Sequence, residues 1–161
     1  MKGKLALSIL LVAVLALVGT GCDKVTGGGQ FTDEWTGHKI TFGFNAKPLD
    51  PLNEDAGYPF IKAKGQFQMV DHGTKTRIHG TFDGTYIEPS EEASWFSGRC
   101  SVNGEGDVYF EITATDLGKP GLGAGDHIFI MVGEFGDPDL LTYEGVLNGG
   151  NIQGHKAKKV K

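Results

Sequence analysis

Apolar and polar residues alternate one by one along much of the chain after position 38. Ile40, Phe42 and Phe44 are each followed by a polar residue or glycine, which is the pattern of a strand with one buried face. Such alternation, or a short apolar run, predicts strands at 38–44, 66–70, 75–82, 93–102, 108–114, 128–132, 140–147 and 151–155. After position 22 we find no long segment with the 3.6-residue apolar period of a helix. The sequence therefore predicts an all-β fold, a single antiparallel β-sandwich domain of about eight strands.

Turn residues separate these strands. Asp71-His72-Gly73 joins one pair and Asn103-Gly104-Glu105-Gly106 joins another, so both pairs are predicted to be hairpins. The segments 47–59 and 116–126 are predicted to be loops because of their Pro, Asp and Gly content. Parity along the strands predicts a core between two sheets, with Cys100 beside it. The predicted core residues are Phe42, Phe44, Phe110, Ile112, Ile128 and Ile130.

The N-terminal residues have the three-part pattern of a secretory signal. Lys2 and Lys4 precede an apolar run at 5–18, and small residues follow before Cys22. The apolar run is shorter than the roughly 20 residues that a membrane-spanning helix needs. A cysteine after small residues resembles a bacterial lipobox, in which the cysteine is acylated and becomes the new N-terminus. We therefore expect Cys22 to be lipidated and to attach the protein to a membrane.

A second interpretation of this signal stays open. Gly19 stands where a lipobox usually has Leu, and Gly19 with Gly21 also satisfies the small-x-small rule for soluble secretion. Both interpretations place the cut before Cys22 and differ only in the lipidation of its thiol. The predicted organisation is a signal peptide at 1–21, the lipidated cysteine with a Gly-rich tether at 22–30, the β-sandwich domain at 31–156 and a basic C-terminal tail at 157–161.

Composition narrows the class of partner. Removal of 1–21 takes away Lys2 and Lys4, so the net charge changes from -5 to -7, and we expect no binding to nucleic acid, which needs a basic stripe. The 26 Gly residues predict many tight turns, while the Phe count of 10 indicates a folded domain. Cys100 lies on the apolar parity of a strand, where an unreactive core thiol is expected. A disulfide with Cys22 is the alternative, which a flexible leader disfavours.

Glycines near both ends of the domain predict that the ends meet. Gly27-Gly28-Gly29 precede the first alternating segment, and Gly149-Gly150 precede the last one. Glycine allows one backbone to approach another closely and permits positive φ. We therefore expect 27–30 to lie beside 151–155. The alternative is that both segments are loose termini.

Several short motifs are spread over residues 27–156. They are Gly27-Gly28-Gly29, Thr41-Phe42-Gly43-Phe44-Asn45-Ala46-Lys47, Val70-Asp71-His72, Thr115-Asp116 with Pro120-Gly121, and Leu147-Asn148-Gly149-Gly150-Asn151-Ile152-Gln153 with His155-Lys156. Together they resemble the post-choice-of-anchor (post-COAP) domain of bacterial surface proteins. The resemblance implies a secreted, β-rich accessory module and supplies no catalytic residues. The chain departs from that family's usual setting in carrying Cys22 where the family has a repeat array or a separate anchor module.

Histidines and acidic loops are candidate metal ligands. His72 and His79 lie across a predicted hairpin, although the sequence has no His-x-His or His-x-x-x-His pair. Asp116 and Asp126 bound a Gly-rich loop, and Asp137-Pro138-Asp139 offers a further pair of carboxylates for Ca²⁺. Aspartates also form turns through their own hydrogen bonds, so we expect these carboxylates to be solvated in turns and the histidines to be exposed or hydrogen-bonded. The sequence therefore predicts no metal site and no cofactor.

We expect no catalytic residues and a binding or structural role. The sequence lacks a Gly-x-Ser-x-Gly elbow, and Gly121-x-Gly123-x-Gly125 precedes a strand where a phosphate cradle needs a helix. The predicted function is a non-catalytic bacterial envelope lipoprotein, a tethered module at the cell surface or in the periplasm. Its predicted partners are the membrane, through Cys22, and an envelope protein or glycan. Exposed aromatic residues would favour such a partner, and the candidates are Trp35, Tyr58, Tyr86, Trp95 and Tyr143.

Two alternative functions stay open at this point. The first is a hydrolase or lyase acting on envelope polysaccharide, which would need converging carboxylates, for example Glu111 with Asp116 or His79. Glu111 and Asp116 have opposite parity, which counts against that pair. The second alternative is a soluble secreted binding protein.

Overall fold

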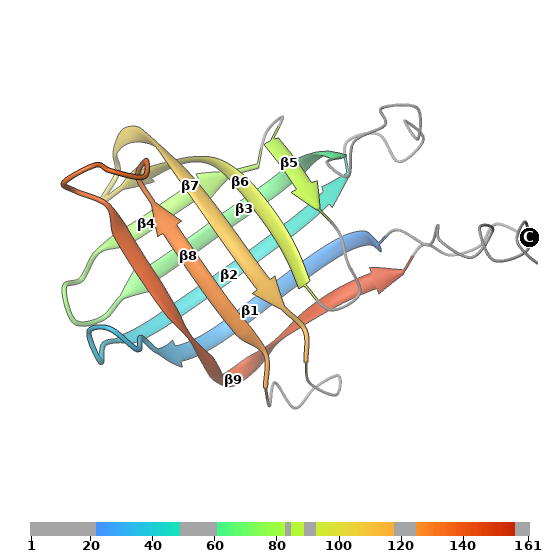
Figure 1. Cartoon of the computed structure of the whole chain (residues 1–161), viewed down its shortest axis with the longest axis horizontal. Helices are drawn as coiled ribbons and strands as arrows, with labels where there is room; N and C mark the ends of the chain where they lie inside the picture. The colour runs from blue at the N-terminus through green and yellow to red at the C-terminus, as the bar shows by residue number, and fades with distance from the viewer. Residues whose placement is uncertain (1–21, 49–60, 83–84, 89–92, 118–124, 157–161) are drawn as a thin grey trace, which may run out of the picture.

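The computed structural model describes residues 22–48, 61–82, 85–88, 93–117 and 125–156. The predicted signal peptide, the predicted basic tail and Tyr58 lie outside these ranges. Every regular element in the described ranges is a strand (Figure 1). The strands are β1 Cys22–Thr32, β2 Lys39–Pro48, β3 Ile61–Asp71, β4 Arg77–Thr81, β5 Thr85–Glu88, β6 Ala93–Val102, β7 Glu105–Thr115, β8 His127–Val132 and β9 Leu141–Lys156. In these ranges we find no helix with the length and apolar content needed to cross a membrane.

The strands close into a β-barrel, so the predicted all-β, antiparallel fold is confirmed but the predicted sandwich is not. Strands that are consecutive in the sequence pair with each other, except β4 and β5, which share one position and each pair with β3 and β6. Pairing of β9 with β1 completes the ring. Both predicted hairpins are present, joining β3 to β4 and β6 to β7. One continuous wall therefore surrounds the core, where we had expected two separate sheets.

Glycines that face the interior explain how large side chains fit inside this barrel. The interior of a barrel of this size is just wide enough for side chains to fill it. A Cβ on Gly80 would lie 2.6 Å from the Phe110 ring, and one on Gly98 would lie 2.7 Å from the same ring. A Cβ on Gly145 would likewise lie too close to the Phe31 ring. Several glycines within the strands therefore make room for phenylalanine rings. This role differs from the tight turns that the glycine content predicts.

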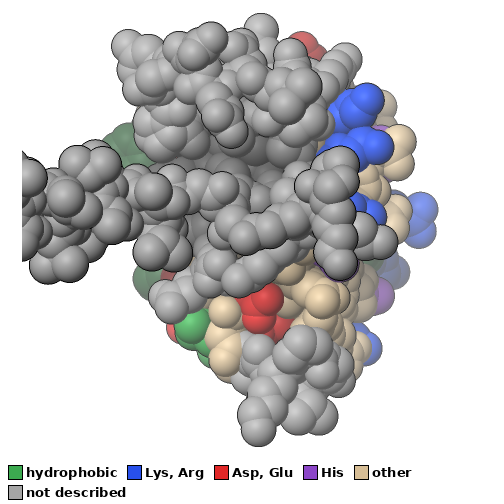
Figure 2. Space-filling model, turned by 90° about the vertical axis from the view of Figure 1, so that its right-hand side faces the viewer, with side chains coloured by type: hydrophobic (Ala, Val, Ile, Leu, Met, Phe, Trp, Pro, Cys, Tyr) green, Lys and Arg blue, Asp and Glu red, His purple; other side chains and the backbone are tan. Residues whose placement is uncertain are grey.

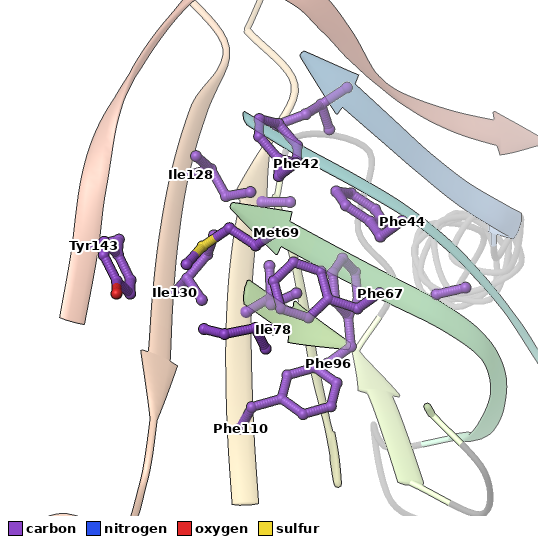
Figure 3. Packing of buried hydrophobic residues seen from close by; sticks show 14 of the residues in the cluster. Phe42, Phe44, Phe67, Met69, Ile78, Phe96, Phe110, Ile128, Ile130 and Tyr143 are labelled. Atoms are coloured by element: carbon purple, nitrogen blue, oxygen red, sulfur yellow. The ribbon is translucent and has the colours of Figure 1, made fainter. Parts of the chain in front are cut away.

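The core is a connected set of phenylalanine rings lined by aliphatic side chains (Figure 3). Ring centroids of Phe67 and Phe110 are 5.2 Å apart, those of Phe82 and Phe110 are 5.4 Å apart, and those of Phe44 and Phe96 are 5.0 Å apart. These are the separations at which aromatic pairs attract one another. All six predicted core residues and Cys100 are buried. The sequence pattern therefore predicts the burial of these residues correctly, although they fill a barrel and not the space between two sheets.

The two ends of the domain meet, as the glycine pattern predicted. Gly27 pairs with Ile152 and Gly28 pairs with Asn151 in the seam between β1 and β9. The backbones approach so closely that a Cβ on Gly29 would overlap the carbonyl of Gly149. The predicted tether at 22–30 is wrong, because these residues belong to β1. The two strands predicted at 140–147 and 151–155 are one long strand, β9.

The barrel has a turn end and a loop end. At the turn end the chain passes from β1 to β2, from β3 to β4, from β6 to β7 and from β8 to β9. At the loop end, β2 ends and β3 begins, β5 ends and β6 begins, and β7 ends and β8 begins; both ends of the described chain also lie there (Figure 1). The strands β4 and β5 follow each other in the same direction along β3. Cys22 begins β1 at the loop end, where its backbone pairs with that of Lys156. The first and last described residues therefore leave the barrel side by side.

Candidate binding face

The outer wall at β2, β3 and β4 carries positive charge without negative charge. We call this surface the cationic face, and it comprises the outward residues of the three strands together with His72 and Lys75 of the turn between β3 and β4. Its described side chains include no Asp or Glu, and Figure 2 shows Lys, Arg and His gathered along one side of the molecule. The cationic residues are all exposed: Lys39, Lys47, Lys64, Lys75 and Arg77, with His72 and His79.

Amide and hydroxyl side chains lie between these cations. In the register of the wall, Asn45 is opposite Gln66 and Gln66 is opposite Thr81. One step along, Gln68 is opposite both Gly43 and His79. The centre of the cationic face is therefore a layer of neutral hydrogen-bonding groups with charges around it.

Two hollows open on the cationic face. The first, of about 290 Å³, has amide side chains around a floor where Gly43 has no side chain; it is lined by Gly27, Gly43, Phe44, Asn45, Gln66, Phe67, Gln68 and His79. We call it the amide hollow. The second, of about 890 Å³, lies at the turn end and is lined by Val70, His72, Lys75, Arg77, Asn103 and Gly104. Donor groups that converge on a hollow are what a polar ligand requires.

The opposite side of the barrel has the reverse charge. We call the outward residues of β7, of β8 and of residues 141–147 of β9 the acidic face. Its described side chains include no Lys or Arg. Its carboxylates are partly engaged with neighbours: the Tyr109 hydroxyl donates to Glu111 Oε1 at 2.7 Å, and His127 Nε2 lies 3.3 Å from Glu144 Oε1. This face therefore satisfies part of its own charge, unlike the cationic face.

A buried carboxylate stabilises the turn between β3 and β4. Asp71 accepts hydrogen bonds from the backbone N–H of Gly73 and from the hydroxyl of Thr74, at 2.8 and 2.9 Å, and its Oδ1 lies 3.1 Å from His38 Nδ1. Burial by itself raises the pKa of the Asp71 carboxyl, but the hydrogen bonds from Thr74, His38 and Gly73 outweigh burial and lower that pKa. Asp71 is thus a stabilised anion that organises a turn.

Asp33 has the same role in the turn between β1 and β2. It accepts hydrogen bonds from Thr36 and from the backbone N–H of Glu144, the latter at 2.9 Å. Burial raises the pKa of the nearby Tyr143 to about 12, with further contributions from the negative charges of Asp71 and Asp33. Tyr143 is therefore a neutral core residue, and its predicted place in an exposed aromatic platform is wrong.

The candidate metal ligands are not brought together. His79 pairs with Gln68 and lies four residues along the wall from the turn that holds His72, or about 13 Å at the usual rise per residue. His72 Nε2 instead lies 3.0 Å from the hydroxyl of Thr41. Among the described residues we find no group of three or more His, Cys, Asp or Glu side chains that could hold a metal ion.

The acidic loop at 116–126 contributes a structural carboxylate rather than an open one. Asp126 is fully buried, and its carboxylate accepts hydrogen bonds from the backbone N–H of Ile152 at 2.8 Å and of Leu117 at 3.2 Å. Asp126 thus joins the start of β8 to the closing strand β9. Asp116 is only partly exposed, and most of the loop between the two aspartates lies outside the described residues.

The residues suggested for a hydrolase do not form a cleft in the described part of the barrel. Glu111 faces outward beside Tyr109, whereas Asp116 follows the end of β7 and His79 is on the cationic face. The Cys100 thiol is buried, and burial raises its pKa to about 11, with the charge of Asp107 adding to the effect. A thiol that stays protonated at neutral pH is a poor nucleophile.

A third hollow lies at the turn-end mouth of the barrel. It has a volume of about 710 Å³ and is lined mainly by apolar side chains: Val102, Val108, Val132, Gly133, Asp137, Pro138, Asp139, Leu140 and Leu141. Nearby Phe135 is 94% exposed, and Trp35 in the first turn is 71% exposed. Trp35 was among the aromatic candidates, but Phe135 was missed because it lies between strands, where parity gives no signal.

No protein-family model matches the chain, and no curated protein and no solved structure matches it.

Proposed function

We propose that this chain is a non-catalytic envelope lipoprotein, in which acyl chains on Cys22 hold a closed barrel on a membrane and the outer wall binds a partner. The observation that supports a binding role is the filled interior of the barrel. The buried carboxylates of Asp33, Asp71 and Asp126 accept hydrogen bonds from the backbone. An enzyme needs polar groups that meet a substrate in a cleft. In the described residues, the polar groups that stay available lie on the outer wall.

The position of Cys22 gives this proposal a definite geometry. An acyl group on Cys22 would begin at the first residue of β1, so the barrel would be held directly at the membrane with its loop end toward the lipid. Lys156 pairs with Cys22, and the lysine-rich residues 157–161 follow it in the sequence. Basic residues beside an acyl anchor strengthen attachment to anionic membranes. The resemblance to the post-COAP domain stays a prediction and agrees with a non-catalytic module.

Acyl labelling tests the anchor. Cells that express the full chain are grown with labelled palmitate, and the protein is recovered from membrane and medium fractions. We expect label and membrane association in the wild type and neither in Cys22→Ala. Cys100→Ala is the matched control, because it removes the only other thiol and should leave labelling intact. Unlabelled wild-type protein in the medium would contradict the anchor and favour the soluble secreted alternative.

A further inference from the structure

We propose that the cationic face binds an acidic polysaccharide, a glycan chain that carries carboxylate, sulfate or phosphate groups. This inference depends on the proposed function in one respect only: an envelope location brings the protein and the glycan into the same compartment. The binding chemistry itself comes from the outward residues of β2, β3 and β4, whether or not Cys22 carries lipid.

The first argument is that the Lys and Arg charges of this face have no carboxylate partners within the described structure. No Lys or Arg of the cationic face is within 4.0 Å of a described carboxylate; the ion pairs found among the described residues are His38–Asp71 and His127–Glu144. The chain as a whole has a net charge of -5, so acidic residues are plentiful but lie elsewhere. Segregation of charge in an acidic protein creates a local field that attracts anions.

The second argument is that one pair of these charges opposes folding. Lys47 and Lys64 are direct partners in the register between β2 and β3. Both are exposed on the outer wall. Like charges directly opposite each other on neighbouring strands are destabilising. An anionic group bound between the two ammonium groups would relieve that repulsion.

The third argument is the chemistry of the amide hollow. Asn45, Gln66 and Gln68 present both donors and acceptors, which suit the hydroxyl groups of a sugar. The missing side chain at Gly43 leaves the floor open, since a Cβ there would have no neighbour closer than 3.6 Å. Lys64 is two residues from Gln66 on the same side of β3, about 7 Å away. A sugar in the hollow would therefore have a cation within reach of its acidic substituent.

The shape of the face favours a chain-like ligand over a protein. Lys39 and Lys47 are at opposite ends of the outward residues of β2, about 27 Å apart at the usual rise per residue. Val70 is the only apolar outward side chain among the described residues of the face. Protein interfaces are enriched in aromatic residues and depleted in lysine at their centres, and this face has the reverse composition. An extended anionic polymer matches both its length and its polarity.

Affinity electrophoresis tests the proposal with defined probes. The full chain, processed by the host cell and purified in mild detergent, is run in native gels that contain polygalacturonate, neutral dextran or no polymer. We expect retardation of the wild type by polygalacturonate and none by dextran. Added salt should weaken the retardation, because exposed charges are screened.

Two variants locate the site without damaging the fold. Gly43→Thr fills the amide hollow and places a β-branched residue in a strand, so the melting temperature should be kept or raised; binding should weaken about tenfold, the equivalent of 1.4 kcal/mol. Gly149→Thr is the matched control, since Gly149 is a glycine of β9 that does not line the hollow and has no atom within 3.7 Å of an added Cβ. Its binding should be unchanged.

The charge variant is Lys64→Gln, with Arg99→Gln as its control. Lys64→Gln should weaken binding about two- to fivefold, the range for one exposed ion pair, while the fold becomes no less stable. Arg99 is an exposed arginine of β6 outside the cationic face, and its guanidinium donates a hydrogen bond to the Asp107 carbonyl at 3.2 Å, so its loss should have little effect on binding. Equal weakening by both variants would show that overall charge, and not this face, attracts the polymer.

Further outcomes separate this inference from the proposed anchor. Absence of retardation of the wild type overturns the inference, and so does equal retardation of the wild type and Gly43→Thr. Binding to vesicles that contain phosphatidylglycerol, without binding to polygalacturonate, would assign the face to a membrane surface and overturn the glycan proposal. Acyl labelling without polymer binding overturns only this inference, whereas polymer binding without labelling overturns only the anchor.

Discussion

The cationic face and the acidic face are built on the same wall but differ in what their outward residues do. Inward residues on both sides fill one core, and rings from β2, β3, β6 and β7 contact one another across it. Outward residues of the acidic face interact locally, as in the pair of His127 with Glu144. Outward residues of the cationic face repel one another, as Lys47 and Lys64 do. The comparison shows that parity divides the chain into residues that serve the fold and residues that are free to serve binding.

Deletion of 151–161 should have the largest effect, because it tests whether the two faces belong to one wall. The deletion removes residues 151–156 of β9, which pair with residues 22–28 of β1, and so opens most of the seam between the faces. We expect loss of the cooperative thermal transition measured by near-ultraviolet circular dichroism. Deletion of 157–161 is the control and should change the melting temperature by less than about 2 °C. A normal transition in the longer deletion would mean that the faces are independent sheets.

Phe110→Ala should cost about 3–5 kcal/mol in the free energy of unfolding, the usual range for a buried Phe. Its ring fills the space over Gly80 and Gly98 and contacts Phe67 and Phe82. Tyr109→Ala removes the neighbouring outward side chain of the acidic face and should cost about 1 kcal/mol or less. Urea denaturation measures both values. Equal losses would show that inward and outward residues of β7 are not distinct.

Acid should destabilise the turn beside the cationic face through Asp71. The pKa of this carboxyl is lowered in the fold from an ordinary value of 3.8, so the folded state binds its proton less readily than the unfolded state. The stabilisation is therefore complete above pH 3.8 and is lost as the pH falls through the lower folded pKa. Asp71→Asn should be less stable than the wild type at neutral pH, and the difference should shrink in acid. Parallel curves of stability against pH would contradict this role.

The smallest expected effect is a change in the free energy of unfolding that has opposite signs on the two faces. Lys64→Gln removes a like-charge contact and should raise the free energy of unfolding by about 0.2–0.5 kcal/mol. Glu144→Gln removes the partner of His127 and should lower the free energy of unfolding by a similar amount when the imidazole is protonated. Both changes are measured by urea denaturation at low ionic strength and should fade in high salt. The same sign for both variants would remove the electrostatic difference between the faces.

Much of the fold could be predicted from local patterns, because strand parity and hairpin turns are local properties. The burial of Phe42 and Phe110 follows from alternation alone, that of Ile130 from a short apolar run, and Asn103-Gly104 predicts a turn. Closure into a barrel could not be predicted in this way. It depends on inward glycines such as Gly98, which a single sequence does not distinguish from the glycines of turns.

The candidate site was harder to predict than the core. The glycines at 27–29 indicated a tether, although they form a strand whose backbone approaches β9 closely. The amide hollow needs Gly43, Gln66 and Gln68 to be neighbours across two strands. That arrangement follows from register, which a one-residue slip would change completely. The overall composition does not indicate the positive charge of the cationic face either, because the chain as a whole is acidic.

The seam between β1 and β9 also sets the order in which the barrel can be completed. Every other strand pairs with one that is near it in the sequence, so those contacts can form early. The second partner of β1 is β9, which follows all other strands in the chain, and closing a loop of that length adds an entropic barrier. During synthesis, one edge of β1 therefore stays unpaired until the final residues of β9 are added. Until β9 is complete, the growing barrel is an open, curved sheet with an exposed edge. The last step of folding is therefore the one most prone to aggregation.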